Sequence, residues 1–300
     1  MRRPSRRSEP APPAGVTSAA GGPMCRRRPT SPAATKGPAM AAQPAREGRF
    51  TTGSTMRHVT VMTLTGAVGL TFMFLVDFAT LLYVSMLGEP SLTAAVGYAW
   101  TIQFFTISAG IGFTIAATAL VSRSLGERDR EAARRRATSA LLTTTAALAV
   151  TAVAVLILRE PILRLLGAQG ETLEVASRFL LISVPSLVVM GAGMTGSGVL
   201  RAEGDARRAM MVTLSAGTAA MILDPFFIFE DVLGVPGLGL GVDGAAWAVV
   251  LSRSLTAVFA LWYVIRTHDL AARPRLGAWL ADLRGILKIA LPATLTQMST

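Results

Sequence analysis

Three charged side chains, Asp77, Asp224 and Arg253, lie inside long apolar stretches of the sequence. A charged group in the hydrocarbon of a bilayer costs at least about 2.5 kcal/mol and usually faces a bundle interior or a water-filled cavity. Apolar surroundings favour the protonated form of a carboxyl group, so such a group can bind and release a proton or a cation. We interpret Asp77 and Asp224 as candidate ion-coupling residues and Arg253 as a possible counter-ion. The alternative is a permanent ion pair, or buried hydrogen bonds that only hold helices together.

Two prolines lie where they could disturb a helix. Pro225 directly follows Asp224, and Pro185 lies in another apolar stretch. Proline removes a backbone donor and clashes with the carbonyl group four residues earlier, so we expect a helix break at both positions. Broken helices near charged side chains are typical of transporter ion sites. The alternative is that both are ordinary, because proline is frequent in membrane helices.

Gln103, Tyr98 and Phe104 form a possible substrate pocket. Aromatic faces attract cations, so a flat, lipophilic cation would suit such a pocket. The alternative is that these side chains face lipid or neighbouring helices.

No pattern in the sequence indicates an enzyme or a metal site. The chain has two histidines and one cysteine, and it contains no HExxH, P-loop or GxSxG motif. We therefore expect no catalytic residues, no metal and no cofactor beyond a coupling ion.

Six apolar stretches must position these side chains. They cover approximately residues 59–86, 92–120, 138–158, 179–200, 209–229 and 244–265. A helix needs about 20 apolar residues to cross a bilayer, so each stretch predicts one span. Charged residues make up only 16% of the chain, against about 25% in soluble domains. We predict an all-α polytopic membrane protein with a six-helix transmembrane bundle, and we exclude a soluble enzyme.

Basic residues are concentrated at one end of this bundle. Of the 29 lysines and arginines, 25 lie in residues 1–57 or in the predicted loops 123–136, 201–208 and 266–288. The positive-inside rule places these segments, and the N-terminus, in the cytoplasm. We predict a multi-pass protein of the plasma (inner) membrane and no nucleic-acid partner, despite a formal net charge of +11.

Residues 1–57 are rich in Pro, Ala, Gly, Ser and Arg and have few large aliphatic side chains. They offer too little apolar surface to offset the entropy of ordering, so we predict a disordered basic tail. Such a tail can touch anionic lipid. The alternative is that translation starts downstream, at Met24, Met40 or Met56.

Several motifs occur in the order and spacing of a known family. Residues 76–88 combine an Asp, an aliphatic run and a Leu-Gly end, and residues 200–205 read Leu-Arg-Ala-Glu-Gly-Asp. Residues 222–229 contain an Asp-Pro pair, and a glycine-rich loop then leads to Asp-Gly-Ala-Ala at 243–246. Over about 59–300 the sequence therefore resembles the multidrug and toxic compound extrusion (MATE) transporters, and within them the DinF-like branch.

The resemblance implies twelve helices in two six-helix lobes, with residues 58–265 as the N-terminal lobe. Residues 266–300 would then be a cytoplasmic linker and the start of the second lobe, so we suspect a truncated sequence. The second lobe would come from the same longer chain or from dimerisation. The resemblance also implies that Asp77 and Asp224 couple transport to H⁺ or Na⁺, although Ala220 stands where the family usually has Asn.

These observations lead us to expect a secondary active exporter, a cation-coupled antiporter of amphipathic, often cationic drugs or toxic compounds. Its partners would be a small amphipathic substrate and the lipid bilayer. One alternative is a flippase for a lipid-linked oligosaccharide or polysaccharide precursor. A second is a non-transporting membrane scaffold.

Overall fold

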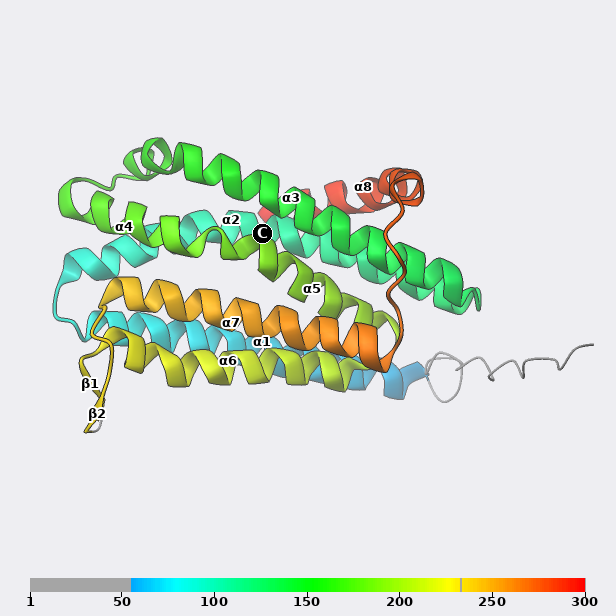
Figure 1. Ribbon diagram of the computed structural model, residues 1–300, viewed down its shortest axis with the longest axis horizontal. Coiled ribbons are helices and arrows are strands. Elements are labelled where there is room, and N and C mark those ends of the chain that lie inside the picture. The colour runs from blue at the N-terminus through cyan, green and yellow to red at the C-terminus, as the bar shows by residue number, and fades with distance from the viewer. Residues whose placement is uncertain (1–54, 233, 300) are drawn as a thin grey trace, which may run out of the picture. The chain divides into compact units, whose positions relative to one another are not determined.

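The computed structural model describes residues 55–232 and 234–299 (Figure 1). The helices in this part are α1 (Thr55–Ser85), α2 (Pro90–Gly126), α3 (Arg130–Leu165), α4 (Gly170–Ser183), α5 (Ser186–Ala202), α6 (Ala206–Ile228), α7 (Val242–Trp262), the π-helical turn η2 (Tyr263–Thr267) and α8 (Leu276–Ser299). Two short strands, β1 (Asp231–Val232) and β2 (Val235–Pro236), pair antiparallel between α6 and α7. The predicted disordered tail covers residues 1–57. Residues 1–54 lie outside the described part, and residues 55–57 begin α1.

The helices form the expected membrane bundle. Five of the described helices, counting α7 with η2, are long and apolar enough to cross a bilayer, and the bent pair α4–α5 makes a sixth span. Figure 1 shows α1, α6 and α7 side by side, with α2, α3 and α4 on the other side and α5 packed between the two groups. The prediction of an all-α, six-helix membrane bundle is confirmed.

The predicted loop at 123–136 is almost entirely helical. Only residues 127–129 separate α2 from α3, because arginine, alanine and glutamate favour helix even beyond the apolar part of a span. The Asp129 carboxylate begins α3 by accepting a hydrogen bond from the backbone N–H of Ala132 at 2.9 Å. Asp205 caps α6 in the same way, accepting from the N–H of Arg208 at 3.2 Å.

The fourth predicted span consists of two helices rather than one. α4 and α5 meet at an angle of 52°, and Val184 and Pro185 lie between them. A proline at this point interrupts backbone hydrogen bonding, so carbonyl groups at the end of α4 need donors from elsewhere.

The predicted helix break at Pro225 is wrong, because α6 runs through Pro225 to Ile228. The carbonyl oxygen of Pro225 accepts a hydrogen bond from the N–H of Phe229 at 2.9 Å, so the turn after the proline closes. A proline removes only its own donor, and it lies close enough to the helix end for the next turn to form.

The glycine-rich loop caps the end of α6. Backbone N–H groups of residues 238–241 donate to the carbonyl oxygens of residues 226–229 over 2.8–3.1 Å. This close approach requires glycine, because a Cβ atom at Gly237 or Gly244 would overlap with the carbonyl oxygens of Phe229 or Phe227. The loop therefore satisfies the last carbonyl groups of the helix that carries Asp224.

The predicted polar linker ends earlier than expected, because α8 already begins at Leu276.

Two neighbouring stripes of α3 hold the linker and α8. In the first stripe, Arg130 Nη2 donates to the carbonyl of His268 at 2.6 Å, Arg134 Nε donates to the carbonyl of Asp269 at 2.5 Å, and the Thr138 hydroxyl accepts from the N–H of Ala272 at 2.9 Å. In the second stripe, Arg135 and Ser139 bind the carboxylate of Asp282 at 3.3 and 2.9 Å, and Thr143 accepts from Trp279 Nε1 at 2.9 Å. The helical start of residues 276–288 thus follows from docking on α3.

Candidate ion-coupling site

Asp224 lies in α6 and is almost completely buried, with 1% of its surface exposed. The hydroxyl of Thr80, in α1, donates a hydrogen bond to Asp224 Oδ2 and also lies 3.1 Å from the carbonyl oxygen of Val76. The other carboxyl oxygen, Oδ1, is buried and has no hydrogen-bond partner. A buried carboxylate is therefore held by one hydroxyl group, with hydrogen-bonding capacity to spare.

Asp77 lies one turn before Thr80 on α1, on the same side of the helix. It is exposed, and within the described residues no hydrogen bond or ion pair to it is found. It is near enough to Asp224 for the two carboxylates to repel each other. The Asp77 side chain therefore lies on a face of α1 that the other described residues leave exposed.

Arg253, in α7, is engaged at the break between α4 and α5. Its Nη1 donates to the carbonyl oxygen of Ser183 at 3.2 Å and to the hydroxyl of Ser186 at 2.9 Å. Its Nη2 donates to Gln103 Oε1 at 2.6 Å. In the described part of the chain no ion pair joins Arg253 to Asp77 or Asp224, although Asp77 attracts it over a longer distance. The guanidinium group replaces donors that the helix break removes.

The three possible pocket residues do not meet. Gln103 is 3% exposed and binds Arg253, whereas Phe104 is 60% exposed and contacts Phe105 edge-on. Tyr98 is partly buried against the apolar core. Consecutive residues on a helix point about 100° apart, and here Gln103 faces the interior of the bundle while Phe104 faces outward.

Sequence reasoning missed Thr80, Ser183 and Ser186. Each carries a small hydroxyl group, and small hydroxyl residues are common in the apolar stretches. Two local signals could have found them. Thr80 lies three residues from Asp77, and the two serines lie on either side of Pro185.

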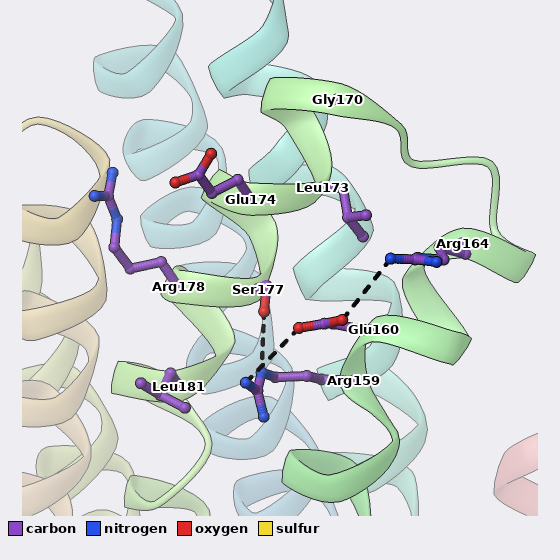
Figure 2. A pocket seen from close by; sticks show the side chains of 9 residues that line it. All are labelled: Arg159, Glu160, Arg164, Gly170, Leu173, Glu174, Ser177, Arg178 and Leu181. Carbon is purple, nitrogen blue, oxygen red and sulfur yellow. Dashed lines mark hydrogen bonds and ion pairs between the residues drawn. The ribbon is translucent and has the colours of Figure 1, made fainter.

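A hollow of about 430 Å³ lies elsewhere, at the end of the bundle that carries the α3–α4 connection. Figure 2 shows it between α3, which contributes Arg159, Glu160 and Arg164, and α4, which contributes Glu174 and Arg178. It contains none of the predicted site residues.

Comparison with known proteins identifies the class. The family model described as MatE matches residues 67–226, which is more than half of the chain. The chain therefore belongs to the MATE family of membrane transporters, and this agrees with the expectation that it is not an enzyme. The matched relatives do not resolve the DinF-like branch.

Individual relatives are distant but consistent. The chain is 26% identical over 246 residues to a FAD transporter of Shewanella oneidensis, covering 79% of this chain and 52% of that one. It is 26% identical over 221 residues to the multidrug export protein MepA of Staphylococcus aureus, covering 71% and 46%. A solved outward-facing multidrug resistance MATE transporter of the MOP superfamily matches with a TM-score of 0.75 and 26% identity, covering 85% and 55%. The chain thus spans about half the length of the relatives it matches.

Proposed function

We propose that this chain supplies the ion-coupling half of a secondary active exporter. One observation carries the proposal. Asp224 is buried in a membrane helix, yet only one of its two carboxyl oxygens has a hydrogen-bond partner, the Thr80 hydroxyl. Most buried polar atoms in proteins have at least one hydrogen-bond partner, and Asp224 Oδ1 has none. Incomplete pairing supports a group that gains and loses a ligand during transport.

The arrangement around Thr80 favours H⁺ over Na⁺ as the coupling ion. The Thr80 hydroxyl has one proton, and it lies within reach of two acceptors, the Val76 carbonyl and Asp224. Both contacts can be hydrogen bonds at once only when Asp224 is protonated and donates to the Thr80 oxygen. Hard cations, by contrast, prefer several oxygen ligands. Ala220 supplies no such ligand, and Thr80 is the one side chain within the described residues that binds the Asp224 carboxyl group.

The remaining features of the proposal follow from the family and the charge pattern. The substrate is a small amphipathic compound, often cationic, and the names of MepA and the FAD transporter indicate which compounds to test first. The second lobe comes from a longer chain or from a second copy, and the arginine-rich end with the N-terminus faces the cytoplasm across the plasma membrane. Neither the flippase nor the scaffold alternative is favoured by these relatives.

The test uses purified protein in proteoliposomes with an imposed pH or Na⁺ gradient. Efflux of a fluorescent lipophilic cation and of FAD is measured for the unchanged chain, Asp224→Asn and the control Glu131→Gln, which alters an exposed acid in the first turn of α3. We expect the pH gradient to drive efflux, Asp224→Asn to abolish it, and the control to keep it.

A direct measurement of proton binding accompanies the transport assay. Infrared difference spectroscopy across a pH step should show a carboxyl band that Asp224→Asn removes and Glu131→Gln keeps. Efflux driven by Na⁺ alone would overturn the choice of proton. Unchanged efflux and an unchanged band in Asp224→Asn would overturn the site.

A further inference from the structure

The hollow between α3 and α4 lies at the depth of lipid headgroups. Arg159 directly follows the apolar residues 138–158, and Arg178 directly precedes the apolar residues 179–200. About 20 helical residues span the hydrocarbon of a bilayer, so both arginines lie at the same boundary between hydrocarbon and water. This boundary is at the end of the bundle opposite the arginine-rich loops (Figures 1 and 2).

Both signs of charge line the hollow, and they are only partly paired. Arg159 is fixed, because it donates to the Ser177 hydroxyl at 2.9 Å and to the carbonyl of Leu156 at 2.6 Å. Glu160 lies 4.0 Å from Arg159 and 3.9 Å from Arg164, too far for hydrogen bonds.

Glu174, on α4, is exposed, and within the described residues no hydrogen bond or ion pair to it is found. Arg178, by contrast, forms an ion pair with Asp243 at 3.1 Å. Two carboxylates, Nη2 of Arg159 and the guanidinium group of Arg164 therefore retain hydrogen-bonding capacity.

Exposed aliphatic side chains continue from the hollow into the bilayer. Leu181 in the lining is 51% exposed, and Ile157, within one turn of Arg159, is 72% exposed. A charged hollow with apolar surface on both sides matches a molecule with a charged head and hydrocarbon chains.

We propose that this hollow binds the headgroup of a phospholipid with a primary amine, of the phosphatidylethanolamine class. Arg159 and Arg164 hold the phosphate, since guanidinium groups suit phosphate geometry. Glu160 and Glu174 accept hydrogen bonds from the ammonium group. The acyl chains lie over Leu181. A choline headgroup has no N–H to donate, and a glycerol headgroup has no positive charge, so neither completes both halves of the site.

The experiment measures which lipids stay bound. Purified protein is equilibrated with micelles containing equal amounts of phosphatidylethanolamine, phosphatidylcholine and phosphatidylglycerol, and retained lipids are counted by native mass spectrometry. We expect retention of phosphatidylethanolamine about fivefold above either competitor, the effect of one partly exposed charge-assisted hydrogen bond. Glu174→Gln should remove this preference. The matched control Glu171→Gln, an exposed acid one turn earlier on α4, should keep it.

Two further arms separate the explanations. Equal retention of the three lipids, or a preference that survives both Glu174→Gln and Arg164→Gln, would overturn the site. Displacement by soluble phosphoethanolamine at concentrations similar to the lipid would show that the chains contribute nothing and would overturn the assignment to lipid. Asp224→Asn should keep the lipid preference, so the outcome does not depend on the proposed transport activity.

Discussion

Two polar sites lie within the spans of the same bundle, and they are built in opposite ways. The guanidinium group of Arg253 makes three hydrogen bonds, to the Ser183 carbonyl, the Ser186 hydroxyl and Gln103. The carboxyl group of Asp224 has one partner, Thr80, and one buried oxygen with none. The sequence alone does not separate the two sites, because each is a charged residue within an apolar stretch.

The difference fits a structural role for Arg253 and the ion-coupling role proposed for Asp224. Arg253 repairs a helix break, and its partners would lose donors without it. One carboxyl oxygen of Asp224 has no hydrogen-bond partner, and no hydrogen bond or ion pair to the nearby Asp77 is found within the described residues. Completeness of hydrogen bonding, rather than burial or charge, distinguishes the two sites. The following substitutions test this distinction through stability, in order of decreasing effect.

Arg253→Ala should have the largest effect on stability. It removes three hydrogen bonds and leaves Gln103 Oε1 without its donor, while the Ser183 carbonyl keeps only the hydrogen bond from the Ser186 hydroxyl at 2.6 Å. At about 0.6 kcal/mol for each hydrogen bond in a membrane, the free energy of unfolding should fall by about 2 kcal/mol. Unfolding by SDS titration measures it, with Arg207→Ala at an exposed position of α6 as the control. Equal stability of the two variants would contradict a structural role for Arg253.

Thr80→Val should have an intermediate effect. It removes the one hydrogen-bond donor of Asp224 while keeping the shape of the side chain. The free energy of unfolding should fall by about 0.6 kcal/mol, roughly a threefold change in the unfolding equilibrium. Thr80→Ser keeps the hydroxyl and should match the unchanged chain in the same titration. If Ser and Val behaved alike, the hydroxyl would have no part in holding Asp224.

Asp77→Asn should have the smallest effect on stability, within about 0.5 kcal/mol, because the side chain is exposed and makes no hydrogen bond or ion pair within the described residues. Proton-driven efflux should nevertheless fall strongly if Asp77 shares the coupling role. The same proteoliposome assay and SDS titration report both quantities. A large loss of stability would reveal a structural contact and place Asp77 in the class of Arg253.

The number of spans and the break at Pro185 could be predicted from the sequence, because apolar length and proline position act locally. The helical ends could not. α2 and α3 extend into the predicted basic loop because nothing there opposes helix, and Asp129 caps the second one. The last carbonyl groups of α6, after Pro225, accept hydrogen bonds from residues 238–241, and no local sequence pattern reveals this pairing.

The same limit applies to the site. Asp224 stands out as a charge in an apolar stretch, but its partner Thr80 lies 144 residues earlier and looks ordinary in sequence. Arg253 also stands out, yet its commitment to Ser183 and Gln103 depends on how four helices pack. Gln103 and Phe104 are neighbours in sequence and diverge in space, since helix geometry separates their directions.

The length of α3 has a mechanical consequence. With 36 residues it is about 54 Å long, well beyond the thickness of the hydrocarbon layer. At one end Arg159 lines the charged hollow, and at the other Arg130 and Arg134 donate hydrogen bonds to the linker. A helix that exceeds its bilayer adjusts by tilting. When α3 tilts in a membrane of different thickness, its contacts with the linker move with it. The position of every segment after residue 268 therefore changes as well.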